Sequence, residues 1–210
     1  MSRFKTCLAA LALALCATPS MAGVLATDFS SYLGIWNGSS TFSSVETYLA
    51  GYIDFAVYAP GDFPGGFGGY TPTPGEFVYT YQAFVTGPSV MSSVTVNLLN
   101  YADNPGTFTG AGVSGDSATL ISLVNLDSAA WTFDGVPSGG STVGLVFSSP
   151  YGPLYSTASF LDHGQQASNI PVPSPDSYTI PEPATFTLAL AGLVGFAFEM
   201  IRRRSRRIRS

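Results

Sequence analysis

The sequence predicts an all-β fold, an antiparallel sandwich or jelly roll, for most of the chain. From residue 23 to residue 164, apolar and polar residues alternate with a period of two over short runs, and Gly, Pro, Asn and Asp separate these runs. The same region shows no helical periodicity longer than a turn or two. Of the 210 residues, 46% are hydrophobic and 10% are charged, which favours one domain with a substantial core.

The clearest predicted strand covers residues 51–60, in which Ile53, Phe55 and Val57 face one side and Asp54 faces the other. A second strand is predicted at 76–85, with alternate residues from Phe77 to Val85 on one face. Further strands are predicted at 34–42, 90–99, 118–126, 130–133 and 142–149. About seven or eight strands in total would fit a sandwich or a jelly roll.

Residues 1–22 have the composition of a secretory signal peptide. Arg3 and Lys5 precede an apolar stretch at 8–17, and small residues then lead to a cleavage site between Ala22 and Gly23. Ten or so apolar residues are too few to span a bilayer. We therefore expect a signal peptidase to remove this segment during export.

Both cysteines, Cys7 and Cys16, lie inside the predicted signal, so the exported chain would contain none. A lipoprotein signal at Cys16 is disfavoured because Leu15, where a small residue is needed, is large. The exported domain therefore has no disulfide, thiolate nucleophile or cysteine metal site, and packing and backbone hydrogen bonds must stabilise it.

A mostly apolar run of 18 residues at 184–201 predicts a transmembrane helix. At about 1.5 Å per residue such a helix is roughly 27 Å long, which just matches the hydrocarbon core of a bilayer. The positive-inside rule keeps the basic cluster after it in the cytoplasm and places the residues before it outside. The cluster comprises Arg202, Arg203, Arg204, Arg206, Arg207 and Arg209.

Ile180-Pro181-Glu182-Pro183 stands directly before this run, and its prolines favour a helix start at residue 183 or 184. The tail thus contains this motif, then one apolar helix, then a terminal arginine cluster, in a chain that also has an N-terminal signal. This combination resembles the PEP-CTERM sorting signal of bacterial exported proteins. Such tails are also labelled by analogy with ice-binding proteins. The resemblance covers only residues 180–210. It implies that an exosortase, a membrane-embedded cysteine protease and transpeptidase, recognises Pro181, Glu182 and Pro183 and cuts near them.

The region between the signal peptide and the sorting tail is acidic, and its last part is rich in proline. Residues 23–180 contain eleven Asp or Glu residues and no Lys or Arg, which argues against nucleic-acid binding. Most of these acids are expected in water or in turns, including Asp62, Asp103, Asp116 and Asp134. Residues 165–179 lack a strand pattern and are rich in proline, so they predict an extended linker between the domain and the tail.

The sequence offers little support for catalysis. His163 is the only histidine, no G-x-S-x-G elbow is present, and we expect no enzyme. A glycosidase would need two acids about 5 to 10 Å apart across a cleft, and one sequence leaves that pairing open.

Binding is a stronger alternative. Some of the acids could bind Ca²⁺, although no EF-hand loop is present and no ligands can be named. No other cofactor is expected. Aromatic side chains could stack on sugar rings, although they are more often core residues. The candidates are Trp36, Tyr52, Tyr58, Tyr70, Tyr79, Tyr81 and Trp131.

Taken together, these patterns predict an exported bacterial protein of the cell surface or extracellular matrix. It is anchored transiently by its C-terminal helix, sorted at its tail, and has a structural or adhesive role. Exopolysaccharide is its candidate partner. The alternative is a carbohydrate- or calcium-binding module delivered by the same route.

Trypsin provides a direct test of the charge distribution. Because no Lys or Arg occurs between Lys5 and Arg202, trypsin should leave this interval intact even when the protein is unfolded. Mass spectrometry of a digest in denaturant would check this, and a tryptic cut inside the interval would contradict it.

Overall fold

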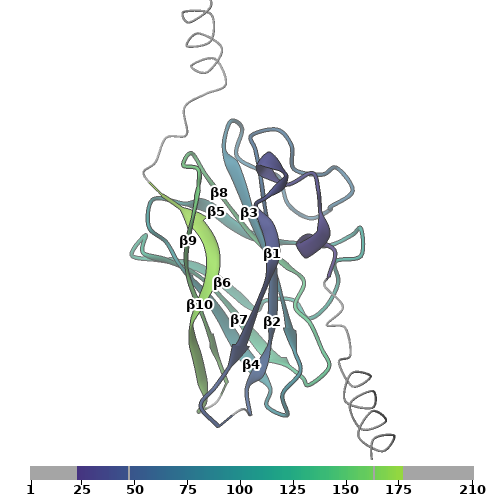
Figure 1. Cartoon of the computed structure of the whole chain (residues 1–210), viewed down its shortest axis with the longest axis vertical. Helices are drawn as coiled ribbons and strands as arrows, with labels where there is room; N and C mark the ends of the chain where they lie inside the picture. The colour runs from purple at the N-terminus through teal and green to yellow at the C-terminus, as the bar shows by residue number, and fades with distance from the viewer. Residues whose placement is uncertain (1–22, 47, 163, 177–210) are drawn as a thin grey trace, which may run out of the picture. The chain divides into compact units, whose positions relative to one another are not determined.

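The computed structural model describes residues 23–46, 48–162 and 164–176 (Figure 1). The described residues form two short 3₁₀-helices and ten β-strands, and the predicted all-β sandwich is confirmed. In chain order the elements are η1 (Leu25–Thr27), η2 (Tyr32–Gly34), β1 (Asn37–Ser43), β2 (Ala50–Tyr58), β3 (Phe77–Val85), β4 (Met91–Asn97), β5 (Asp103–Phe108), β6 (Leu120–Val124), β7 (Ser128–Val136), β8 (Gly144–Ser149), β9 (Pro153–Leu161) and β10 (Gln166–Pro175).

The strands form two five-stranded sheets in which all neighbouring strands are antiparallel. Sheet 1 has the order β1-β2-β3-β8-β5, and sheet 2 has the order β10-β9-β4-β7-β6. The chain crosses between the sheets from β3 to β4, β4 to β5, β5 to β6, β7 to β8 and β8 to β9. Residues distant in the sequence are therefore brought together in every layer of the domain.

Each predicted strand overlaps an observed one, but the sequence does not predict β5, β9 or β10. In β5, Pro105 and Gly106 break the alternation, and a register shift separates Asp103 from Gly106 in its pairing with β8. In β9 the large side chains of Leu154, Tyr155 and Leu161 are exposed, and Ala158 and Phe160 are its buried core residues. Both strands depend on pairing with neighbours instead of on their own pattern.

The proline-rich linker predicted at 165–179 is wrong for residues 166–175, which form β10. Val172 pairs with Ser156 and Pro173 with Tyr155 of β9, and Val172 is completely buried. Proline is tolerated because β10 is an edge strand, where alternate N–H groups have no strand to donate to. The domain therefore extends to Asp176, and residues 177–179 lie outside the described chain.

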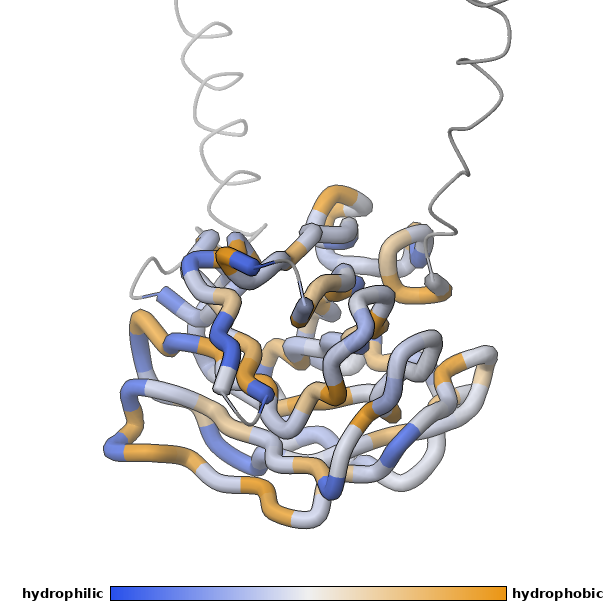
Figure 2. Tube along the Cα trace, turned by 90° about the horizontal axis from the view of Figure 1, so that it is seen from below, coloured by the Kyte–Doolittle hydropathy of each residue, from blue (hydrophilic) through white to orange (hydrophobic). Residues whose placement is uncertain are grey.

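The main core lies between the two sheets. As predicted, Ile53, Phe55 and Val57 share one face of β2 and pack in this core with alternate residues of β3. Trp131 of β7 is the largest completely buried side chain, and its ring lies 6.4 Å from that of Phe147 in β8. Figure 2, which looks along the long axis, shows hydrophobic and hydrophilic residues alternating along much of the trace.

Sheet 1 is also covered on its outer face. Tyr58, Val78 and Val146 point away from the main core and form a second apolar cluster. Residues from η1 and from the loops around 59–75 and 109–116 complete this cluster; they include Leu25, Phe63, Phe67, Tyr70 and Val113. The central strands of sheet 1 are consequently buried on both sides, and β2, β3 and β8 carry few exposed residues.

Hydrogen bonds from buried aromatic side chains connect the two sheets. The Tyr81 hydroxyl of β3 donates to the backbone oxygen of Pro173 in β10. The indole Nε1 of Trp131 donates to the backbone oxygen of Gly106 in β5 at 2.9 Å. Each bond satisfies a polar group inside an apolar core and fixes how one sheet lies against the other.

If β10 belongs to the domain, Val172→Ala should destabilise it. The substitution removes two buried methyl groups, and we expect a loss of about 2 kcal/mol in the free energy of unfolding. Ser168→Ala, at an exposed position of the same strand, is the matched control. Chemical denaturation of the full chain would measure both, and equal stability of the two variants would restore the linker interpretation.

Candidate functional site

Most residues that the sequence predicts for signal cleavage, sorting and membrane anchoring lie outside the described chain. These are Ala22, the motif at 181–183, the predicted helix at 184–201 and the arginines at 202–209. His163 also lies outside it. Within the ranges that are described, no helix has the length and apolar character needed to cross a membrane. Of these cleavage, sorting and anchoring residues, Gly23 alone lies in the described chain.

Gly23 contacts a buried carboxylate. Its backbone nitrogen donates a hydrogen bond to Oδ2 of Asp54, which lies in β2 on the outer face of sheet 1 and is completely buried. Burial raises the pKa of Asp54, and hydrogen bonds from Ser39 and from the Gly23 nitrogen act in the opposite direction. The other oxygen, Oδ1, has no donor among the described residues. This carboxylate is therefore only partly compensated for its loss of water.

Asp28 is a second carboxylate on this face, and it is fully engaged. Its Oδ1 accepts hydrogen bonds from the backbone nitrogen and the hydroxyl of Ser30 at 2.9 and 2.7 Å, and its Oδ2 accepts one from the Tyr58 hydroxyl at 2.6 Å. Burial alone would raise the pKa of Asp28, but these bonds lower it. Burial and the contact with Asp28 raise the pKa of Tyr58. Asp28 thus attaches the N-terminal segment to sheet 1.

Glu76 and Asp103 form a carboxyl pair at one end of sheet 1. Burial, the charge of Asp103 and a hydrogen bond between the two side chains raise the pKa of Glu76 to about 7. The Thr73 hydroxyl also donates to Oδ1 of Asp103 at 3.1 Å. Within the described chain no donor reaches Oε2 of Glu76. A proton shared by the two carboxyl groups therefore makes their contact favourable.

This pair does not have the geometry of a glycoside hydrolase. Such enzymes hold their two carboxyl groups about 5 to 10 Å apart so that a sugar and a water fit between them. Glu76 and Asp103 instead share a hydrogen bond. The Tyr70 hydroxyl lies nearby, 2.9 Å from the Ser148 hydroxyl, and burial raises the pKa of Tyr70 to about 12. The polar groups here bond to one another and stabilise the loops.

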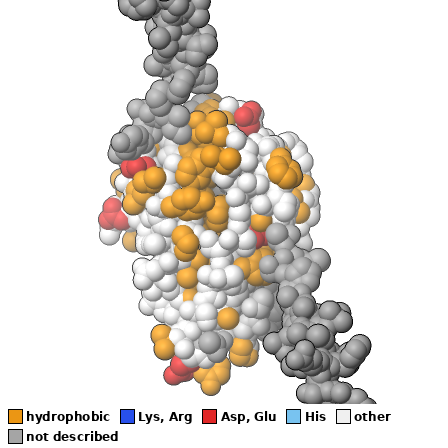
Figure 3. All heavy atoms as spheres, viewed as in Figure 1, with side chains coloured by type: hydrophobic (Ala, Val, Ile, Leu, Met, Phe, Trp, Pro, Cys, Tyr) orange, Lys and Arg blue, Asp and Glu red, His pale blue; other side chains and the backbone are white. Residues whose placement is uncertain are grey.

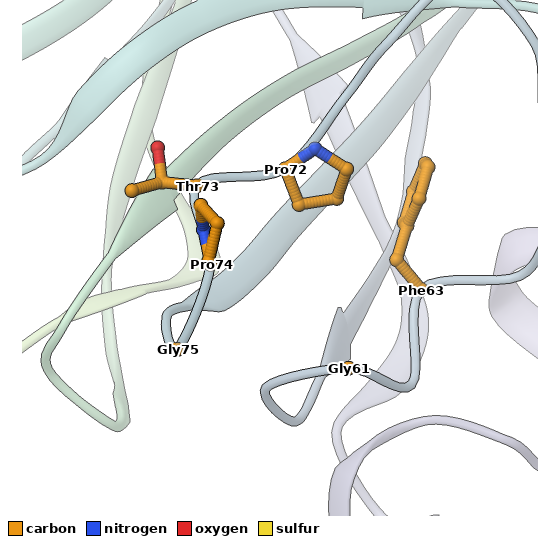
Figure 4. A pocket seen from close by; sticks show the side chains of 6 residues that line it. All are labelled: Gly61, Phe63, Pro72, Thr73, Pro74 and Gly75. Carbon is orange, nitrogen blue, oxygen red and sulfur yellow. The ribbon is translucent and has the colours of Figure 1, made fainter.

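A shallow pocket of about 380 Å³ lies next to this pair (Figure 4). Figure 4 shows the rings of Phe63 and Pro72 facing each other across it, while Thr73 lies on the side away from Phe63. None of its lining residues carries a charged side chain. Its lining comprises Gly61, Phe63, Pro72, Thr73, Pro74 and Gly75.

Four of the seven aromatic residues considered for sugar stacking are completely buried and cannot serve as platforms: Tyr58, Tyr79, Tyr81 and Trp131. Tyr52 stacks on Phe84 with ring centroids 4.6 Å apart, and Tyr70 belongs to the outer cluster. Trp36 remains near the surface, 5.3 Å from the ring of the half-exposed Tyr155.

The acidic residues are dispersed. In the described ranges, no group of three or more Asp, Glu, His or Cys side chains is arranged to hold a metal ion. Asp62 is exposed in a turn and Asp116 is exposed outside the strands, as expected. Asp103 and Asp134 lie in β5 and β7, so their placement in turns is wrong. Figure 3 accordingly shows a few separate carboxylates at the margins of a face that is mostly hydrophobic or neutral.

Sequence reasoning missed the burial of Asp54. The strand pattern correctly places it opposite Ile53 and Phe55, but the sequence predicts that most of the acids lie in water or in turns. One signal was present: Tyr52, Ala56 and Tyr58 share the face of Asp54, and such apolar neighbours on both sides of a strand indicate that both faces are covered.

A comparison with family models matches residues 179–207 to the PEP-CTERM protein-sorting motif. The predicted resemblance of the tail is thereby confirmed, and the motif marks an exported protein that an exosortase sorts to the cell envelope or surface. The match begins after the last described residue, Asp176, and so does not bear on the sandwich. Neither the curated proteins nor the solved structures contain a match to the chain.

The carboxyl pair predicts a pH dependence of stability. Because folding raises the pKa of Glu76 from 4.5 to about 7, its stabilising contribution is complete below pH 4.5 and is lost as the pH rises through about 7. Glu76→Gln should remove this part of the dependence and raise the melting temperature at pH 8. Thermal unfolding between pH 4 and pH 8 would measure the effect, with Asp134→Asn at an exposed position as the control. Identical profiles for both variants would refute it.

Proposed function

We propose that this protein is a structural or adhesive component of the bacterial cell surface or extracellular polymer. Signal peptidase would remove residues 1–22, and the helix at 184–201 would hold the chain in the membrane with its N-terminus outside. Exosortase would then process the chain near Pro181, Glu182 and Pro183. The sorting motif at 179–207 is the observation that carries this proposal.

The outer face of sheet 2 supports a role in contact with hydrated polymer. Alternate residues of β4, β7 and β9 point away from the main core on this face, and many carry hydroxyl groups. Thr95 pairs with Ser159, and Ser93 pairs with Thr132. Uncharged hydroxyl groups exchange hydrogen bonds with water and with sugar hydroxyls, and they do not repel an acidic polysaccharide.

The protein is proposed to act without catalysis. The buried polar side chains of the described domain mainly bond to its own backbone, as Thr80, Tyr81 and Gln82 do. They do not converge on the pocket of Figure 4. This is the pattern of groups that stabilise a domain.

A carbohydrate- or calcium-binding module remains the second candidate, favoured by the neighbouring, mutually tilted rings of the partly buried Trp36 and the half-exposed Tyr155. Glycan-array binding that is lost in Tyr155→Ala would support it. Calcium titration of the full chain would test the metal alternative, which would require ligands beyond the pair of Glu76 and Asp103.

Sorting predicts a processed C-terminus. In the native host, the chain should end near residues 181–184, and Glu182→Gln should slow processing at least tenfold because it changes the acidic residue of the motif. Glu199→Gln, the same change within the apolar run, is the control. Intact mass and C-terminal peptides from a non-tryptic digest would measure this. A chain that still ends at Ser210 would make the helix a permanent anchor and defeat the sorting proposal.

A further inference from the structure

A sequence prediction and a structural observation both concern the backbone nitrogen of Gly23. The composition of residues 1–22 predicts that the exported chain begins with this atom. The structure shows the same nitrogen donating a hydrogen bond to Oδ2 of the buried Asp54. The cleavage prediction made no use of Asp54, so the coincidence of the two positions needs a physical explanation.

The Asp54 carboxylate lacks a positively charged partner and a hydrogen-bond donor for its Oδ1 among the described side chains around it. Its Oδ1 has no donor within the described chain, and no Lys or Arg occurs from residue 6 to residue 201. Tyr52, on the same strand, is a titratable side chain in electrostatic contact with it, and Tyr52 never carries a positive charge. A positive charge at this carboxylate must therefore come from a group other than Lys or Arg.

Position 23 also favours the smallest residue. A methyl group there would overlap Oδ2 of Asp54 and would approach the Phe84 ring of β3 to 3.0 Å. Glycine lets its nitrogen reach the carboxylate while the chain passes between Asp54 and Phe84. The local geometry thus fits a chain terminus that is inserted against β2.

We propose that removal of the export signal creates the missing cation, and that the α-ammonium group of Gly23 forms an ion pair with Asp54. Hydrolysis of the Ala22–Gly23 bond consumes one water and leaves a carboxylate on Ala22 and an ammonium on Gly23. The amide of the precursor has one N–H donor, whereas the ammonium has three and can also donate a hydrogen bond to Oδ1 of Asp54. This inference rests on signal cleavage, which is part of the proposed function.

The pairing makes the stability of the sandwich depend on maturation. In the precursor the buried Asp54 accepts hydrogen bonds only from neutral groups, the Ser39 side chain and the Gly23 amide, whereas in the mature chain it faces a charge of opposite sign. Charge-assisted hydrogen bonds are roughly twice as strong as neutral ones. The mature domain is therefore more stable than the same domain with the signal attached.

The composition of the chain permits a selective experiment. Lys5 is the only lysine, so a chain that begins at Gly23 has its α-amine as its single primary amine. An acetylating reagent that attacks unprotonated amines reports on that group alone. An ion pair that raises the pKa of the amine by one unit or more above its usual 7.7 to 8.0 slows acetylation about tenfold or more at pH 7.

The exported full chain, confirmed by mass to begin at Gly23, would be acetylated at pH 7 in buffer and in urea. We expect folded wild type to react at least tenfold more slowly than unfolded wild type, and folded Asp54→Asn to react nearly as fast as the unfolded chain. Asp134→Asn, an exposed carboxylate of the same kind, should react like wild type. Gly23→Ala should lose most of the protection, because its methyl group displaces the terminus.

The results that contradict the ion pair can be told apart from those that contradict export. An exported chain that begins at another residue, or a Gly23 amine whose reactivity is the same in wild type and Asp54→Asn, refutes the ion pair but leaves export intact. If Asp54→Asn does not fold, equal acetylation rates of folded and unfolded wild type still refute it. A chain that keeps residues 1–22 and stays in the cytoplasm refutes both the pairing and the proposed export.

Discussion

The lack of any lysine or arginine between residues 6 and 201 is the constraint on which the arrangement of this domain depends. A buried carboxylate usually has a basic side chain as its partner, and here it cannot. Asp28 uses the hydroxyls of Ser30 and Tyr58, and Glu76 shares a hydrogen bond with Asp103. Asp54 accepts a hydrogen bond from the backbone nitrogen of Gly23, the first described residue of the domain. Each solution attaches a loop or a terminus to sheet 1.

These attachments explain why sheet 1 is buried on both faces. The main core covers its inner face, and the N-terminal segment and the long loops close over its outer face. Tyr81 and Trp131 then connect the sheets through backbone oxygens of the opposite layer. In a domain without cysteine, hydrogen bonds of this kind and close packing take the place of disulfides.

Delivery and folding are specified by separate parts of the chain. The matched motif at 179–207 is a linear signal, which an enzyme reads from local sequence. The sandwich ends at Asp176, only a few residues before the motif, because β10 extends the domain into the proline-rich region. The broad surface left uncovered by loops is the outer face of sheet 2, with Thr95 and Ser159 among its paired residues.

The sequence by itself determined the fold class, the alternation that puts Ile53 and Asp54 on opposite faces, and the sorting tail, because all three depend on neighbours close in the chain. Tertiary structure alone decided that β10 is a strand and that the segment at Gly23 is the one that covers Asp54. A strand of alternating prolines is stable only beside β9, and a carboxylate loses its water only when a distant segment, here Gly23, closes over it. Both results depend on contacts between residues far apart in the sequence, which local patterns do not encode.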